Sequence, residues 1–277
     1  MLHRKLNIVT LLSSLFIISA ANAGSAFSYT DSMSKAGFNG INKPEIPLHN
    51  SMDNFVETYA GNNGRFFEKI KLSKSGYFKT IEKIFTQNNI PVELKYLAVV
   101  ESKMNTNALS GCGALGLWQF MPATAKRFGL KITTSYDERK HVWKSTTAAA
   151  RYLNYLHNML GDWLLVIASY NSGPAPVLNA IKRSGSRNFW KLQYFLPKET
   201  RMHVKKFIAT HYVFEGKGSL VTLGKEESEK YISAIETFNA ANVNKEKDNK
   251  PADDENYPHQ WVAIAGNEKF ITLLLRK

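Results

Sequence analysis

The sequence predicts an all-α protein with one helical domain and a polar C-terminal extension. Between positions 50 and 215, apolar residues recur every three or four positions, the spacing of one face of a helix. The alternating apolar and polar pattern of a β-strand does not occur in this part of the sequence. Turn residues such as Pro91, Gly161 and Pro174 separate the periodic segments. A chain of 277 residues can bury one sizeable core with these helices.

The first half of the domain contains three predicted helices. Residues 77–85 place apolar side chains on one helical face, and the turn residues 88–91 end that helix. Residues 94–101 have no polar face, which predicts a helix buried in the core. A loop and a glycine-rich turn follow, and a short helix is expected over 122–128.

The second half of the domain contains four further predicted helices. The hydroxyl residues 145–147 are expected to cap a long helix that ends at Gly161. Asp162 begins an almost wholly apolar helix. Pro174 begins the next helix, and residues 199–214 predict the last one.

The N-terminal residues 1–23 predict a secretory signal peptide. Basic residues precede the apolar stretch 11–18, and the small residues 21–23 form a cleavage site. The apolar stretch is too short to span a membrane, although an uncleaved anchor is the alternative. Residues 24–48 are polar and predict an extended leader. We expect a periplasmic or exported protein that is soluble after cleavage and associates with the cell wall or outer membrane.

The helical domain is assigned to residues 49–216, which leaves residues 217–277 as a C-terminal extension of unknown role. Residues 239–260 are rich in polar residues that favour solvation over packing. The apolar runs within 261–275 predict a terminal hairpin. The extension is either an accessory binding element, for instance for a cell-envelope protein partner, or a tail without catalytic meaning.

The formal charge of +13 becomes +11 when Arg4 and Lys5 leave with the signal peptide. This balance favours an acidic partner such as nucleic acid, an anionic membrane or an anionic wall polymer, and export argues against nucleic acid. The single cysteine, Cys112, excludes an intramolecular disulfide. It lies between two glycines, which favours a small turn residue over a reactive thiol. The chain is expected to act as a monomer.

Glu101 is the strongest candidate for a catalytic residue. It follows the apolar run 97–100 at the end of the predicted buried helix. Burial and the negative end of the helix dipole both favour the protonated carboxyl group. Glu101 is therefore a candidate general acid of the kind that protonates the leaving oxygen of a glycosidic bond.

Two later segments offer groups that can bind a sugar. Gln119 carries both a donor and an acceptor, and Trp118 either stacks on a sugar face or fills the core. Phe120 is assigned to the core. Tyr170 and Asn171 stand at the end of the apolar helix, where a phenol and an amide can contact a substrate.

Four segments resemble the motifs of the lytic transglycosylases in the soluble-transglycosylase, lysozyme-like superfamily. The resemblance covers residues 75–215, and the motifs in order are Glu101-Ser102 with Asn105, residues 113–122, residues 168–173 and residues 196–201. Trp118 and the segment 145–156 resemble the membrane-bound transglycosylase D branch. The resemblance implies a lysozyme-like helical domain of the goose-type lysozyme and transglycosylase kind.

The resemblance also implies a reaction. Glu101 would protonate the β-1,4 glycosidic oxygen between N-acetylmuramic acid and N-acetylglucosamine in peptidoglycan. It would then act as the base on the muramoyl 6-hydroxyl, giving a 1,6-anhydro end without water. The resemblance places a further set of residues beside the substrate: Ser102, Trp118, Gln119, Met121, Tyr170 and Asn171. No cofactor or metal is implied, and the seven histidines form no cluster typical of a metal site.

The chain departs from the family pattern at His203, and two alternative functions are compatible with its sequence. His203 occupies the position where relatives usually carry Tyr, which leaves open how Glu101 is held. Hydrolysis by the two usual routes needs a second carboxylate, and Asp137, Glu138 and Asp162 lie outside the substrate motifs. The alternatives to the transglycosylase are a hydrolytic lysozyme on the same fold and a catalytically silent peptidoglycan-binding protein.

Overall fold

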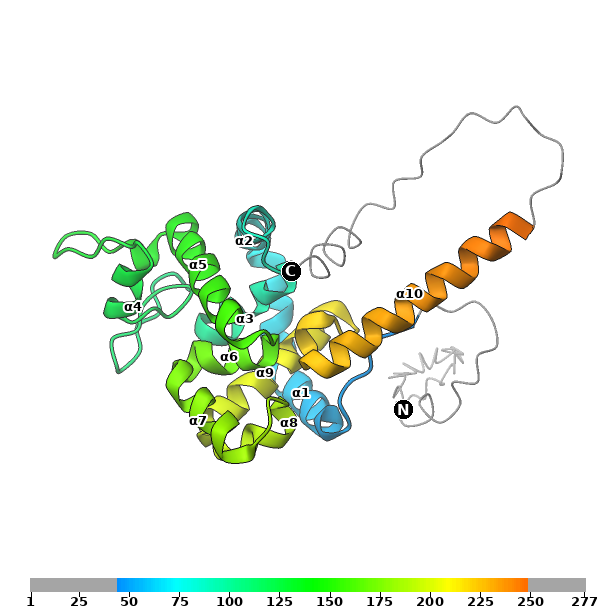
Figure 1. The fold of residues 1–277 in the computed structure, drawn as a ribbon. Coiled ribbons are helices and arrows are strands. Elements are labelled where there is room, and N and C mark those ends of the chain that lie inside the picture. The colour runs from blue at the N-terminus through cyan, green and yellow to red at the C-terminus, as the bar shows by residue number, and fades with distance from the viewer. Residues whose placement is uncertain (1–43, 249–277) are drawn as a thin grey trace, which may run out of the picture. The chain divides into compact units, whose positions relative to one another are not determined.

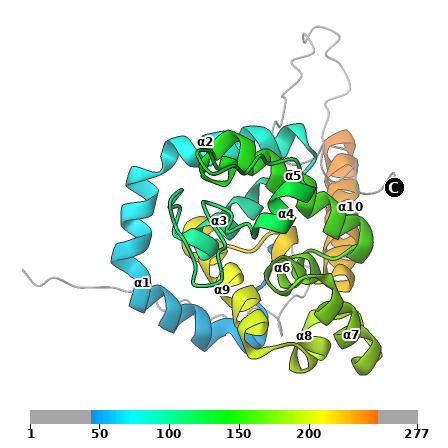
Figure 2. The ribbon, with the colours of Figure 1, turned by 90° about the vertical axis from the view of Figure 1, so that its left-hand side faces the viewer.

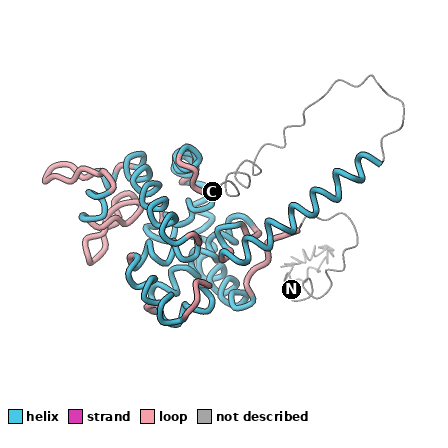
Figure 3. The backbone as a smooth tube through the Cα atoms, in the orientation of Figure 1, coloured by secondary structure: helices cyan, strands magenta, loops and turns pink. Residues whose placement is uncertain are grey.

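The computed structural model describes residues 44–248 as helices joined by loops (Figure 3). The predicted signal peptide, most of the leader and the predicted hairpin 261–275 lie outside the described residues. In chain order the α-helices are α1 Asp53–Ser73, α2 Ser75–Gln87, α3 Tyr96–Ser102, α4 Pro122–Arg127, α5 Val142–Leu160, α6 Trp163–Ser172, α7 Pro174–Ser184, α8 Phe189–Leu192, α9 Lys198–Glu215 and α10 Lys225–Asp248. The 3-10 turns are η2 Asn50–Met52, η3 Val92–Lys95, η4 Glu138–Lys140, η5 Gln193–Phe195 and η6 Leu220–Thr222.

The all-α prediction is confirmed for the described residues, whose only β-type pairings are isolated bridges in loops. Helices α3, α6 and α9 lie in the middle, with α1, α2, α5 and α7 around them (Figure 2). Helix α6 packs against α5, α7 and α9, and its residues from Trp163 to Ser169 are all buried. Burial on every side explains why its sequence has no polar face. Within residues 44–248, no helix is both long and apolar enough to cross a membrane.

The predicted start of α5 is wrong by about one turn. The helix begins at Val142, and its N-cap is His141, whose ring nitrogen accepts a hydrogen bond from the Lys144 backbone N–H. Ser145 therefore lies inside the first turns of the helix, where its hydroxyl donates to the His141 carbonyl. Other predicted boundaries hold. Asp162 caps α6 by accepting from the Leu165 N–H, and Gly161 ends α5 with a φ of 64°.

Residues beyond 216 pack on the helical domain, which the sequence-based boundary did not anticipate. Val221 and Leu223 are buried, and η6 lies against α6. The second carboxylate oxygen of Asp162 accepts from the Lys225 N–H at 2.7 Å, which joins the starts of α6 and α10. Helix α10 then continues through part of the segment expected to be merely solvated, and it projects from the other helices (Figure 1).

A buried histidine makes the stability of this domain depend on pH. His211 of α9 is fully buried, and its Nε2 lies 2.8 Å from Oγ of Ser219. Burial lowers the pKa of His211 from 6.5 to about 4. As the pH falls from about 6.5 towards 4, His211 therefore binds a proton in the unfolded chain but not in the folded chain. This difference lowers the free energy of unfolding by an amount on the order of 3 kcal/mol.

We expect the free energy of unfolding to fall as the pH is lowered from about 6.5 to about 4. The fall should be less steep in His211→Gln, because the amide of Gln can still bond Ser219 but cannot titrate. Denaturant unfolding at each pH measures this slope. His141→Asn is the matched control, because His141 is exposed and Asn preserves the cap of α5. An equal slope in His211→Gln and the wild-type chain would show that His211 is not the group responsible.

Candidate active site

Glu101 lies at the carboxyl end of α3, as its sequence position predicts. The helix ends in two residues with left-handed backbone, Lys103 with a φ of 55° and Met104 with a φ of 60°. Their backbone N–H groups bond back to the carbonyls of Val99 and Ala98, and the Met104 side chain is fully buried. This tight ending turns the chain away directly after Glu101. The Glu101 side chain is 13% exposed, so its carboxyl group is largely sheltered yet still reachable.

The partner of Glu101 is His203 of α9. The Nε2 atom of His203 lies 2.9 Å from Oε1 of Glu101, and the His203 side chain is 9% exposed. Thr200, one turn earlier on α9, donates from its hydroxyl to Oδ1 of Asn171 at 2.9 Å. One face of α9 thus contacts both the acid on α3 and the amide at the end of α6.

Ser102 holds the backbone of the site together. It is 7% exposed, and its Oγ lies 2.8 Å from the Leu117 carbonyl and 3.1 Å from the Ala98 carbonyl. The same oxygen accepts from the Asn105 N–H. The Ser102 hydroxyl therefore joins the end of α3 to the loop that follows, and its role as a substrate contact stays a prediction.

Trp118 belongs to the core, which corrects its prediction as a substrate-binding residue. Its side chain is fully buried, its ring packs on Phe85, and its Nε1–H donates to Oγ1 of Thr146 at 3.0 Å. A ring with no exposed surface cannot stack on a sugar. Of the two readings that the sequence left open, the structure selects the core.

Tyr170 supports the loop from the other side and lies within electrostatic range of Glu101. Its hydroxyl donates to the Trp118 carbonyl at 2.9 Å. Burial, and then the negative charge of Glu101, raise the pKa of Tyr170 well above its ordinary value. The phenol consequently stays protonated and remains a hydrogen-bond donor near the acid.

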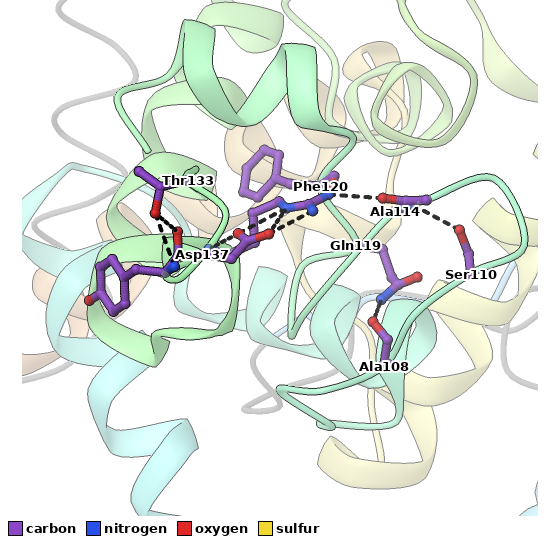
Figure 4. A network of polar contacts seen from close by, with 10 residues as sticks. Ala108, Ser110, Ala114, Gln119, Phe120, Thr133 and Asp137 are labelled. Atoms are coloured by element: carbon purple, nitrogen blue, oxygen red, sulfur yellow. Dashed lines mark hydrogen bonds and ion pairs between the residues drawn. The ribbon is translucent and has the colours of Figure 1, made fainter. Parts of the chain in front are cut away.

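Gln119 is part of a folded loop between α3 and α4. Its φ is 48°, and its Nε2 donates to the carbonyls of Ala108 and Gly116, both at 2.9 Å. In Figure 4 the Gln119 amide points across the loop towards Ala108. Both bonds use the amide nitrogen, so the amide oxygen is the atom left to accept from a substrate. Met121, which follows and caps α4, is 42% exposed.

The residue that holds this loop in place, Arg139, was not predicted. Its side chain is 8% exposed, and its NH1 donates to the carbonyls of Gly113 at 2.8 Å and Phe120 at 2.9 Å. The remaining nitrogens bond both oxygens of Asp137, beside the loop in Figure 4. The hydrogen bond from Arg139 lowers the pKa of Asp137, which is therefore a carboxylate at neutral pH. Because arginine is rarely buried, no sequence pattern pointed to this role.

The three carboxylates considered as second catalytic groups are all engaged in other contacts. Asp137 pairs with Arg139, and Glu138 pairs with the Lys144 ammonium while accepting from the Lys131 N–H. Asp162 accepts from two backbone N–H groups at the starts of α6 and α10. Each carboxylate therefore has a structural function with partners other than Glu101. Among residues 44–248 no group of three metal-ligating side chains occurs.

Comparison with known proteins agrees with this geometry. Residues 79–193 match the Transglycosylase SLT domain family. Over 172 residues the chain is 38% identical to membrane-bound lytic murein transglycosylase D of Escherichia coli K12, an alignment that covers 60% of this chain and 37% of the relative. A transglycosylase of the bacteriophage PRD1 is 33% identical over 98 residues, which cover 35% of each chain. The chain thus spans little more than a third of the length of either relative.

The similarity of this chain to solved structures is weaker than its similarity to these sequences. The 70 kDa soluble lytic transglycosylase of E. coli has a TM-score of 0.49 and 24% identity, over 64% of this chain and 32% of that chain. The resemblance inferred from the motifs is confirmed at the level of the domain by the sequence matches. The chain contains a transglycosylase SLT domain and is homologous over this region to lytic murein transglycosylase D.

Proposed function

We propose that the protein is a peptidoglycan lytic transglycosylase that acts at the cell wall after export. The observation that carries the proposal is a sheltered Glu101, bonded to His203, within an SLT domain whose other candidate carboxylates are engaged elsewhere. A mechanism with one acid fits this site better than one with two. The high positive charge of the chain suits an anionic wall polymer.

In the proposed reaction Glu101 is first an acid and then a base. Its proton passes to the glycosidic oxygen, the bond from that oxygen to the muramoyl anomeric carbon breaks, and Glu101 becomes a carboxylate. The carboxylate then takes the proton of the muramoyl 6-hydroxyl, whose oxygen bonds to the anomeric carbon. The products are a 1,6-anhydromuramoyl end and a free N-acetylglucosamine end, with no water consumed and Glu101 again protonated.

We propose that the other predicted contact residues bind the substrate through the atoms that their internal hydrogen bonds leave free. The Gln119 oxygen can accept from a sugar hydroxyl, and the Asn171 nitrogen can donate once Thr200 has oriented the amide. The exposed Met121 side chain offers an apolar surface. Tyr170 keeps its hydroxyl on the Trp118 carbonyl, so we propose that it shapes the site through the loop and contacts the substrate with its ring.

The proposal is tested by digesting purified sacculi and identifying the ends of the released fragments by mass spectrometry. We expect soluble fragments with 1,6-anhydromuramoyl ends. Fragments with reducing muramoyl ends would instead assign a hydrolytic lysozyme. Binding to sacculi without any released fragment would assign a silent peptidoglycan-binding protein.

A further inference from the structure

The two ring nitrogens of His203 have different surroundings. Nε2 lies 2.9 Å from Oε1 of Glu101. Nδ1 is buried and has no hydrogen-bond partner among the described residues. A proton on Nδ1 would be buried without an acceptor, which is costly, whereas a proton on Nε2 is bonded to the carboxyl oxygen. These surroundings favour the neutral imidazole with its proton on Nε2.

The position of His203 is fixed by packing on both sides of it along α9. Val204 and Phe207 are fully buried, and Thr200 is bonded to Asn171. Helix α9 contacts both α3, which carries Glu101, and α6. The imidazole therefore has little freedom to turn away from the carboxyl group. An apolar side chain of similar size would fill this space without leaving a buried nitrogen unpaired, so packing alone does not explain a histidine here.

We propose that neutral His203 is the positioning residue for Glu101. It donates from Nε2 to Oε1 and so orients the carboxyl group, which leaves the other carboxyl oxygen to exchange its proton with the substrate. This inference rests on the proposed role of Glu101 as acid and base. While Glu101 is protonated, the bond joins two neutral groups. Once the proton has passed to the glycosidic oxygen, the same N–H faces a carboxylate and the bond becomes stronger.

An interaction that strengthens as the reaction proceeds lowers the barrier, whereas one that is equal in both states does not. The strengthening bond from His203 favours the transfer of the proton from Glu101 to the glycosidic oxygen. His203 touches neither sugar in this account, so its loss should change kcat and leave KM nearly constant. A purely structural histidine would show the opposite pattern, with a loss of stability and little change in kcat.

The test compares three variants with the wild-type chain: His203→Gln, His203→Asn and His203→Phe. The amide nitrogen of Gln can reach the place of Nε2, whereas the shorter Asn reaches only the place of Nδ1, and Phe fills the space without a donor. We expect kcat to fall about 10- to 100-fold in the Asn and Phe variants, the range for losing a hydrogen bond to a charged group, with KM changed less than about threefold. The Gln variant should recover most of the rate.

Thermal unfolding of each variant provides the stability readout. We expect the Phe variant to unfold no earlier than the wild-type chain, because it removes the unpaired Nδ1. A Phe variant with wild-type kcat would overturn the positioning role. So would Gln and Asn variants that are equally slow, and this polar pair remains informative if Phe does not fold. A wild-type chain that releases no fragments would instead overturn the proposed function itself.

Discussion

Replacing Glu101 with Gln is expected to abolish release of fragments from sacculi while the domain stays folded. Gln has nearly the shape of Glu and can still contact His203, but it has no acidic proton to give and cannot become a carboxylate. General acid or base catalysis contributes roughly 10²–10⁴-fold to a rate, and Glu101 is proposed to serve in both steps. We therefore expect a fall in turnover of at least about 10³-fold.

Release of soluble fragments per unit time measures this effect, and the thermal unfolding midpoint shows that the fold is kept. Glu57→Gln is a suitable control, because Glu57 is an exposed acid on α1 and its variant should keep full activity. Undiminished cleavage by Glu101→Gln would remove Glu101 from the mechanism. A large loss of stability in the same variant would mean that Glu101 supports the fold.

Replacing Gly116 with Ala is expected to destabilise the loop beside the site by about 2–4 kcal/mol. Gly116 has a φ of 87°, which disfavours any side chain. A Cβ atom at this position would also clash with the carbonyl oxygen of Arg139. That oxygen belongs to the backbone of η4, and the Arg139 side chain holds the same loop at Gly113 and Phe120. The clash therefore cannot be relieved without moving the residue that fixes the loop.

Gly113→Ala separates the clash from the backbone strain. Gly113 has nearly the same φ, 86°, but a Cβ atom there would meet nothing within 4 Å. We expect this variant to lose only about 1–2 kcal/mol. Denaturant unfolding measures both losses, and fragment release shows whether Gly116→Ala loses activity in addition. Equal losses in the two variants would show that the close approach of Arg139 to Gly116 does not matter.

Most of the helices could be predicted from the sequence because the residues that start, continue and end each of them are neighbours in the chain. The apolar run of α6, its Asp162 cap and the glycine that ends α5 depend on neighbouring residues alone. The start of α5 was misplaced because its cap is a histidine side chain, an unusual N-cap that the hydroxyl residues 145–147 obscured. Helix α10 was not predicted because its polar composition resembles that of a solvated segment, although Glu, Lys and Ala also favour helices.

The site was predictable only in part, because several of its contacts join distant parts of the chain. The position of Glu101 follows from its own helix, and the structure gives it a sheltered place at the end of α3. The partner His203 is 102 positions away, so the sequence could mark it as a departure but could not show what it touches. Trp118 was assigned to the substrate because tryptophan serves both cores and binding sites, and only its burial decides between these roles.

We propose that one carboxyl group, that of Glu101, cleaves the glycan without water. Digestion of purified sacculi in water enriched with oxygen-18 tests this claim most directly, since hydrolysis transfers an oxygen atom from the solvent to the new muramoyl end and intramolecular attack does not. We predict 1,6-anhydromuramoyl ends that carry no oxygen-18 in the wild-type digest, and no such ends with Glu101→Gln. New muramoyl ends labelled with oxygen-18 would contradict the account, because they would show that water completes the reaction.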